Sequence, residues 1–321
     1  MIGSREVVVG VDLGGTKSAG AVVGADGAVG QSRSIPTPAR HGPAAVLDAV
    51  AGLVCDLAAR VPAGTIVRGV GVGTAGSVYV AAGRIVSAPD LLRGWAGTSI
   101  ADELHVRIES RFGPVAVHVQ NDVDAHAAGE AWIGAASGLD TVLVIAVGTG
   151  VGGAVVIGGK PLRGAHHVAG EIGHVPTPGA EGLRCGCGRL GHLEALGSGP
   201  SLHRHYLALG GTSAASDARE VIALAAEGHA IASRAVASSA AAVGRGAAAV
   251  VTVLDPDAVL ITGGLAGAGQ QWWSAMEAAL RAELVDPLAA IPVLAAALGN
   301  DAAIVGAARG AWDLLGVSSW T

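Results

Sequence analysis

The sequence predicts an α/β protein of two lobes with a cleft between them. Two observations lead to this prediction. The pattern of strand, glycine turn and strand occurs twice, over residues 7–23 and 141–157, and apolar segments with helical and strand periods alternate along the rest of each half. With 51% hydrophobic and 14% charged residues, the 321-residue chain is long and apolar enough to bury more than one core.

The first lobe opens with three β-rich segments. Val7–Val11, Ser18–Val23 and Val29–Arg33 predict a β-meander, because turn residues lie between them. Helical and strand patterns then alternate, at Pro43–Arg60, Val67–Val72, Thr98–Ser110 and Val115–Val119, with Thr98 or Ser99 as the N-cap of the second helix. We expect this small lobe to span residues 1–118 and a closing helix, at about 301–317, to pack back on it.

The second lobe is expected over residues 119–300. It begins with strands at Thr141–Val147 and Ala154–Ile157, and residues 158–199 form a loop-rich insertion. Helical patterns at Ser201–Leu209, Ala215–Ala226 and Ala230–Leu254 and a strand at Asp257–Ile261 complete it.

Charge and cysteine content exclude several classes of function. The net charge is −6 and no block of like charge occurs, so neither nucleic acid nor a membrane surface is an expected partner. The first residues are too few and too charged for a signal peptide or a membrane span, which predicts a cytoplasmic protein. Three cysteines cannot form a disulfide framework, so Cys185 and Cys187 indicate metal binding or redox chemistry.

Three glycine turns are candidate phosphate sites. In Asp12-Leu13-Gly14-Gly15-Thr16-Lys17, glycines let backbone amides approach an anion, but a plain hairpin turn fits equally well. Gly148-Thr149-Gly150 begins a run with dinucleotide-binding spacing; we exclude a Rossmann site because a strand pattern follows it. Gly263-Gly264 either borders an adenine or simply ends a strand.

Asn121-Asp122 stands at the head of a predicted helix. On the residues alone, its simplest role is an N-cap for Val123–Ile133. A carboxylate in this place beside a cleft also suits a general base.

Five motifs, taken in order, resemble the ROK family of sugar kinases, which have the actin-like ATPase (ribonuclease H-like) fold. They are Asp12-Leu13-Gly14-Gly15-Thr16, Asn121-Asp122, Gly148-Thr149-Gly150, Glu171-Ile172-Gly173-His174 and the run from Cys185 to Glu194. The resemblance covers nearly the whole chain. It implies transfer of the γ-phosphate of ATP to a sugar hydroxyl, the 6-hydroxyl by family likeness, with Asp122 as the general base.

By the same resemblance, each motif receives a role. Gly76, Asp90, Asn121, Asp122, Glu171, His174 and Glu194 are expected at the sugar. The nucleotide is expected at Asp12, Gly14, Gly15, Thr16, Lys17, Gly148, Thr149, Gly150, Gly263 and Gly264, with Asp12 orienting Mg²⁺ through water.

The family's zinc loop has one histidine and three cysteines. Here the corresponding residues are His174, Cys185, Cys187 and His192, so a histidine replaces one cysteine. Zinc accepts imidazole nearly as readily as thiolate, so a structural Zn²⁺ is expected, although a metal-free loop stays open.

The identity of the sugar is left open by two departures from the family pattern, Ala75 and Asp90. A hexose such as glucose, an amino sugar such as N-acetylmannosamine or kanosamine, and a C7 cyclitol all remain candidates, and ordinary sequence drift explains both departures equally well. The family also contains repressors with an added DNA-binding domain. Because the first strand begins near residue 7, a DNA reader is not expected, whereas a non-catalytic sugar sensor stays possible. Family likeness further implies a homodimer or tetramer.

Overall fold

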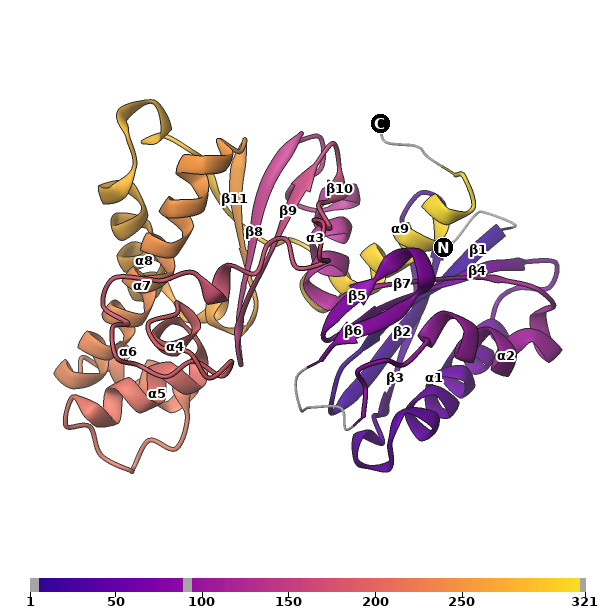
Figure 1. The fold of residues 1–321 in the computed structure, drawn as a ribbon, viewed down its shortest axis with the longest axis horizontal. Helices are drawn as coiled ribbons and strands as arrows, with labels where there is room; N and C mark the ends of the chain where they lie inside the picture. The colour runs from indigo at the N-terminus through magenta and orange to yellow at the C-terminus, as the bar shows by residue number, and fades with distance from the viewer. Residues whose placement is uncertain (1–5, 89–93, 318–321) are drawn as a thin grey trace. The chain divides into compact units, whose positions relative to one another are not determined.

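The computed structural model describes residues 6–88 and 94–317, which form two compact units (Figure 1). Unit 1 comprises the chain up to Gly138, residues 159–169 and the chain from Ala297. Unit 2 comprises Leu139–Gly158 and Gly170–Ala296. The described residues form two mixed five-stranded sheets, and each unit has its own helices, so the predicted α/β class is confirmed.

The sheet of unit 1 has the strand order β3-β2-β1-β4-β7. The predicted meander is confirmed, since β1 (Glu6–Leu13), β2 (Lys17–Gly24) and β3 (Val29–Pro36) pair antiparallel in sequence. β4 (Ile66–Thr74) and β7 (Ala116–Asn121) then run parallel to β1. The carboxyl ends of β1, β4 and β7 therefore meet at one edge.

Helices cover both faces of this sheet (Figure 1). α1 (Pro43–Ala58) and α2 (Ile100–Phe112) lie on one face, and α9 (Ala302–Leu314) lies on the other with α3 (Asp122–Ile133) against it. α1 buries positions 46, 47, 50, 53, 54 and 57, the spacing of one helical face. Of the two residues predicted as the N-cap of α2, the structure has Ser99 in that position. The hydroxyl of Ser99 donates to the carboxylate of Asp102 at 2.8 Å.

Glycines let α9 approach its neighbours backbone to backbone. A Cβ on Gly10 of β1 would overlap the carbonyl oxygen of Ile304, and one on Gly71 of β4 would overlap that of Ala307. On the opposite side, a Cβ on Gly306 would overlap the carbonyl oxygen of Ala125 in α3. Helix α9 is thereby held tightly between the sheet and α3.

Unit 1 also contains short elements that the sequence analysis did not predict. A small hairpin of β5 (Ser77–Tyr79) and β6 (Arg84–Ser87) encloses the turn η2 (Val80–Ala82), and η1 (Ala39–His41) precedes α1. The sequence-distant segment 159–169 also packs within unit 1, where the ring of His167 lies 4.9 Å from that of Tyr79.

Within unit 2, four strands have the order β9-β8-β11-β12. β8 (Thr141–Val147) and β9 (Val151–Ile157) form an antiparallel hairpin, whereas the two-residue strand β10 (Lys160–Pro161) belongs to the segment 159–169 of unit 1. β11 (Ala258–Thr262) runs parallel to β8 and to β12 (Val293–Ala295). Because β9 follows the glycine turn directly, the exclusion of a Rossmann site is confirmed.

Five helices are described in unit 2: α4 (Glu194–Gly197), α5 (Gly199–Ala208), α6 (Ala218–Ala226), α7 (Ala230–Leu254) and α8 (Gln270–Glu283). The 3₁₀ turns η3 (Ile172–His174), η4 (Gly264–Gly267) and η5 (Asp286–Leu288) also belong to this unit, and η6 (Gly299–Asp301) precedes α9 in unit 1. α6 begins three residues later than predicted, because Asp217 caps it by accepting from the amides of Arg219 and Glu220.

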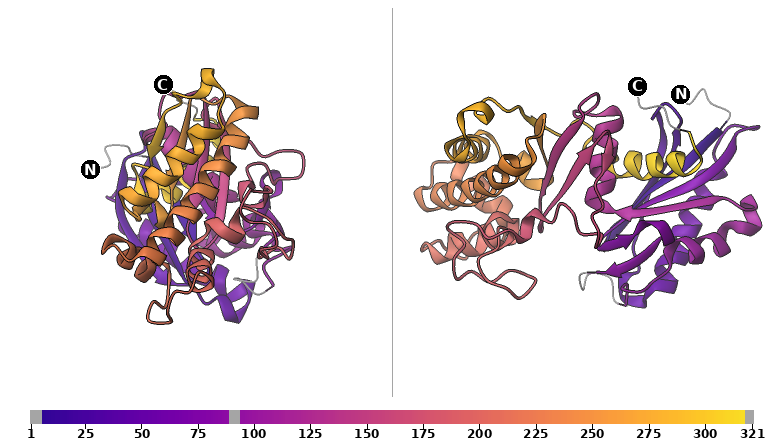
Figure 2. Two further views of the ribbon diagram at one scale, coloured as in Figure 1. Left: turned by 90° about the vertical axis from the view of Figure 1, so that its left-hand side faces the viewer. Right: turned by 45° about the horizontal axis from the view of Figure 1, so that its top comes forward.

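The long helix α7 packs beside α8, as Figure 2 shows. A Cβ on Gly244 of α7 would overlap the carbonyl oxygen of Met276 in α8, so the two backbones touch. Among the described helices, only α7 is long and apolar enough to cross a membrane, yet 56% of its most apolar window is buried in the protein. This burial is typical of a core helix.

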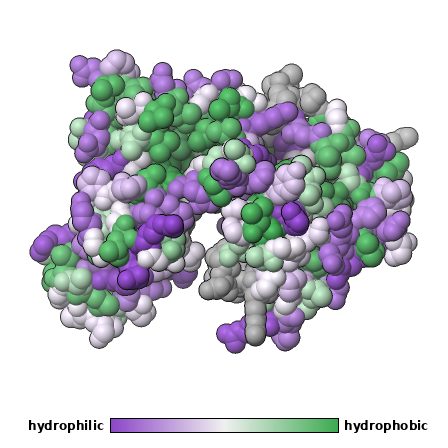
Figure 3. All heavy atoms as spheres, viewed as in Figure 1, coloured by the Kyte–Doolittle hydropathy of each residue, from purple (hydrophilic) through white to green (hydrophobic). Residues whose placement is uncertain are grey.

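Apolar residues also reach the surface of both units, mixed with polar ones on the face drawn in Figure 3. Val253 of α7 is 88% exposed and Val106 of α2 is 70% exposed. Single exposed apolar side chains are normal for a folded protein, so they indicate no binding surface by themselves.

Candidate active site

Two carboxylates stand at the carboxyl edge of the sheet in unit 1. Asp12 lies near the end of β1, and Asp122 is the first residue of α3, directly after β7. The register places Asp12 opposite Gly73 of β4, and Thr74 of β4 opposite Asn121. Parallel strands thus bring together residues that are far apart in the sequence.

Both carboxyl groups have raised pKa values. Burial and, to a smaller extent, the charge of Asp122 raise the pKa of Asp12 to about 6, against the lowering effect of Lys17. Burial also raises the pKa of Asp122, against the hydrogen bond that its Oδ1 accepts from the Val123 amide at 3.0 Å. Paired, half-buried carboxylates of this kind are suited to proton transfer or to holding a cation.

Asn121 is the N-cap of α3. Its Oδ1 accepts from the amides of Val123 and Asp124 at 2.8 and 3.2 Å, and its Nδ2 donates to the carbonyl of Gly76 at 3.0 Å. The predicted capping role is therefore filled by Asn121, while Asp122 occupies the first helical position. Two residues predicted at the sugar, Asn121 and Gly76, are neighbours in unit 1.

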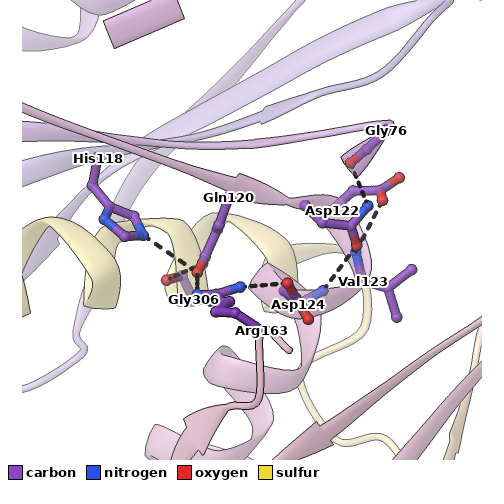
Figure 4. Close-up of polar contacts among 9 residues, drawn as sticks. Gly76, His118, Gln120, Asp122, Val123, Asp124, Arg163 and Gly306 are labelled. Carbon is purple, nitrogen blue, oxygen red and sulfur yellow. Dashed lines mark hydrogen bonds and ion pairs between the residues drawn. The ribbon is translucent and has the colours of Figure 1, made fainter. Parts of the chain in front are cut away.

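A polar network that the sequence analysis missed surrounds this junction (Figure 4). Arg163 pairs with Asp124 and donates to Gln120 at 2.5 Å, and the side chain of Gln120 donates to the carbonyl of Gly306 at 3.0 Å. Burial, with the nearby charge of Arg163, lowers the pKa of His118 to about 4.

The first glycine turn closes the β1–β2 hairpin. The amide of Gly14 donates to the carbonyl of Lys17 at 3.2 Å, and the side chains of Thr16 and Lys17 are exposed. The plain hairpin is thus present, and it leaves a hydroxyl and an ammonium available beside Gly15.

Unit 2 contains a pocket of about 530 Å³, a size common for small-molecule sites. Gly148 and Thr149 of the second glycine turn and Gly264 after β11 line it, as three of the predicted nucleotide residues. The other lining residues come from the beginnings of α5 and α6 and from η4: Gly199, Pro200, His203, Arg204, Ser216, Asp217, Ala218, Arg219, Ile222 and Leu265. Arg204 and Arg219 lie at this pocket with the glycine turn and with the carboxylate of Asp217, so the pocket offers polar groups of both charges.

The remaining predicted glycines shape this pocket without lining it. Gly148 donates its amide to the carbonyl of Gly150 at 2.9 Å and accepts from the amide of Gly199 at 2.8 Å. Gly263 has φ of 89° and passes so close to β8 that a Cβ would lie 2.5 Å from the carbonyl oxygen of Val147. Only glycine fits such a position without strain.

The four predicted metal ligands come together in unit 2. One ligand atom from each of His174, Cys185, Cys187 and His192 lies within 4.8 Å of all the others. Cys185 Sγ is 3.6 Å from His174 Nδ1, and Cys187 Sγ is 3.3 Å from His192 Nδ1. Zn–N and Zn–S bonds in a tetrahedral site would separate such atoms by roughly 3.3–3.8 Å, so the donor set fits zinc.

The chemistry of the thiols agrees with a metal site. Without a cation, burial raises the pKa of Cys185 to about 11, which disfavours the thiolate. A bound Zn²⁺ would reverse this, because it coordinates and stabilises thiolate sulfur.

Glu194 connects this cluster to the second glycine turn. Its Oε2 accepts from the amide of Val151 at 3.2 Å, and its Oε1 accepts from the thiol of Cys185 at 3.5 Å. Glu171 lies near the cluster as well, with Oε2 3.8 Å from His174 Nε2. The predicted sugar and metal residues of unit 2 are thus grouped around one loop, whereas the predicted residue Asp90 lies outside the described residues.

These features define the class of protein: two α/β units of the actin-like ATPase fold, one with paired carboxylates and the other with a pocket and a zinc-type loop. A model of the ROK family matches residues 8–312, so the chain belongs to the ROK family.

Two curated relatives are similar to this chain. The glucokinase of Streptomyces coelicolor is 35% identical, over 94% of this chain and 96% of its own length. The kanosamine kinase of Amycolatopsis mediterranei is 35% identical, over 93% of this chain and 94% of its own length.

Two solved structures share the fold. The ROK hexokinase of Thermus thermophilus has a TM-score of 0.84 and 34% identity, covering 97% of this chain and all of the other. The ROK glucokinase of Streptomyces griseus, solved with glucose and AMPPNP, has a TM-score of 0.77 and 30% identity, covering 94% and 98%.

Proposed function

We propose that this protein is an ATP-dependent, glucokinase-like sugar kinase that transfers a phosphoryl group to an alcohol, the 6-hydroxyl of a hexose or amino sugar. The observation that carries the proposal is the pair Asp12 and Asp122 at one sheet edge, each with a raised pKa. The similarity to glucokinases at 30–35% identity over nearly the whole chain supports the same activity.

In this mechanism Asp122 is the general base. It accepts the proton of the attacking sugar hydroxyl as the oxygen bonds to the γ-phosphorus, and ADP leaves. A carboxylate with a raised pKa is a stronger base than an ordinary aspartate. Asn121, by capping α3 and bonding to Gly76, holds this carboxylate and one border of the sugar site.

Asp12 is proposed to hold Mg²⁺, through water. When bound, the ion neutralises charge on the phosphates. The acidic pair fits a cation, because a positive charge would relieve the repulsion between Asp12 and Asp122. Gly14, Gly15, Thr16 and Lys17 are proposed to contact phosphate oxygens.

The pocket of unit 2 is proposed to take the nucleoside of ATP. Gly148-Thr149 and Gly264 line it, and Ile222 with Leu265 offers an apolar contact for a base. Gly150 and Gly263 act by letting the turns approach closely.

Glu171, His174 and Glu194 are proposed to bind sugar hydroxyls. His174 is also a proposed zinc ligand, so in this proposal one of its ring nitrogens binds the metal and the other binds the sugar. The structural Zn²⁺ would hold this loop in place through His174, Cys185, Cys187 and His192.

A second candidate is a kanosamine kinase. The Amycolatopsis kanosamine kinase is as similar to this chain as the Streptomyces glucokinase is, at 35% identity. The two candidates share every step above and differ only in the acceptor sugar.

The test is ADP release from Mg·ATP with glucose, mannose, N-acetylmannosamine, N-acetylglucosamine, kanosamine and a C7 cyclitol. We expect turnover with one of them, at least 10³-fold reduced in Asp122→Asn while that variant still binds the sugar. Undiminished turnover in Asp122→Asn would exclude the base assignment. Sugar binding with no turnover in the wild type would favour a non-catalytic sensor.

A further inference from the structure

Arg163 connects the two elements that meet at Asp122 (Figure 4). One guanidinium nitrogen pairs with Asp124, the third residue of α3, and another donates to Gln120 at 2.5 Å, near the end of β7. A single side chain from the segment 159–169 thus binds the residues on both sides of Asn121-Asp122.

The partners of Arg163 are themselves anchored. Gln120 is 1% exposed, and while its Oε1 accepts from Arg163, its Nε2 donates to the carbonyl of Gly306 in α9 at 3.0 Å. Asp124 is 14% exposed in its side chain, so its pair with Arg163 is screened less than a surface pair. The contacts of Arg163 and Gln120 therefore connect β7 and α3 to the buried helix α9.

The contact requires the shape of arginine. Two donors on one planar group reach a carboxylate and an amide oxygen at the same time, which the single ammonium of lysine does not reproduce. Without Arg163, the buried Oε1 of Gln120 would lose its guanidinium donor and keep its 3.4 Å contact to His118. The carboxylate of Asp124 would lose its ion pair with Arg163.

We propose that Arg163 is a positioning residue for Asp122: it fixes the angle between β7 and the first turn of α3, and so the place of the proposed base. This inference rests on the proposed function, because it concerns the same carboxylate. Misplacement of a catalytic group by about 1 Å costs on the order of 10²-fold in rate, so the effect belongs to kcat.

The first experiment measures kcat and KM of Arg163→Ala. We expect kcat to fall roughly 10- to 100-fold, with KM for sugar and for ATP within about threefold of the wild type. The control is Arg107→Ala in the same unit. Arg107 also bonds two carboxylates, those of Asp48 and Glu103, but on α1 and α2, so kcat should not change.

Chemical rescue separates positioning from general support of the fold. A pocket of about 150 Å³ lies beside Arg163, whose side chain is 26% exposed, so a small cation can reach the space that Arg163→Ala opens. Millimolar guanidinium should raise kcat of this variant at least fivefold. It should leave kcat of the wild type and of Arg107→Ala unchanged.

Asp122→Asn is measured in parallel. If Asp122→Asn keeps its turnover, the base assignment fails, whatever Arg163→Ala does. If Asp122→Asn is inactive but Arg163→Ala retains wild-type kcat, positioning by Arg163 is wrong and the base assignment stands. A loss of kcat that guanidinium does not rescue, with a lower unfolding temperature, would make Arg163 merely structural.

Should Arg163→Ala fail to fold, Arg163→Lys replaces it. It keeps the charge but serves only one partner, so kcat should fall severalfold, and unchanged kcat would overturn the proposal.

Discussion

The thiol of Cys185 lies 3.5 Å from Oε1 of Glu194, so a proposed zinc ligand touches a proposed sugar ligand. The other carboxylate oxygen of Glu194 accepts from the amide of Val151, where β9 leaves the second glycine turn. The loop with the four candidate metal ligands and the second glycine turn are therefore joined through one side chain.

Removal of the metal should consequently impair sugar binding first. We expect one zinc per chain, and after chelation a rise in KM for the sugar of at least tenfold with a smaller change in KM for ATP. His192→Cys should keep one zinc, whereas Cys185→Ser should lose it. Elemental analysis with paired kinetics checks this, and a wild-type preparation well below one zinc per chain that is fully active would contradict it.

The raised pKa of Asp12 predicts that this residue destabilises the fold at neutral pH. The folded protein favours the protonated carboxyl, so stability falls as pH rises from about 4, the unfolded pKa, through about 6, and the full penalty remains above that. Without Mg²⁺ at pH 7.5, Asp12→Asn should be more stable by about 1–3 kcal/mol, and this gain should vanish near pH 4. Urea unfolding at both pH values tests it; equal gains at both would show another cause.

Ile222 on α6 lines the pocket proposed for the nucleoside. Ile222→Ala removes apolar contact and should raise KM for ATP about three- to tenfold without changing KM for the sugar. Leu224→Ala is the matched control, since Leu224 is on the same helix and also packs against the core of unit 2 but does not line the pocket. Equal effects of the two substitutions on KM for ATP would argue against a nucleoside in this pocket.

The close contact between α9 and α3 makes Gly306 intolerant of any side chain. Gly306→Ala should cost at least 3 kcal/mol or so of unfolding free energy, because its Cβ overlaps backbone rather than a movable side chain. Gly52 in α1 has no atom within 4 Å of such a Cβ, so Gly52→Ala should be neutral or stabilise by about 0.4–1 kcal/mol. Thermal and urea unfolding of the two variants gives the comparison.

Local patterns were sufficient for much of the fold. The meander and the strand after Gly150 follow from periods and spacings that a single segment carries, whereas the four metal ligands came from the resemblance to the ROK family's zinc loop. The sequence analysis did not predict α8, although its buried residues Trp272, Met276 and Leu280 recur every fourth position, which is the spacing of one helical face. The β5–β6 hairpin has strands of three and four residues, too short for a period to register.

Contacts between residues far apart in the sequence could not be predicted from sequence patterns. Arg163 stands in a loop next to residues that suggest a turn, and its partners lie 39 and 43 positions away. Likewise, the pocket proposed for the nucleoside combines turns and helix ends from four parts of the chain, so only the glycines among its residues had a local signature.

The packing of α9 has a consequence for how the protein is made. Residues 302–314 lie against β1, β4, β7 and α3, yet all of unit 2 is translated between those elements and this helix. A growing polypeptide on the ribosome can therefore complete unit 2 while the other unit still lacks one face of its sheet. Until the last helix leaves the exit tunnel, the apolar strands on that face stay open to chaperones and to aggregation.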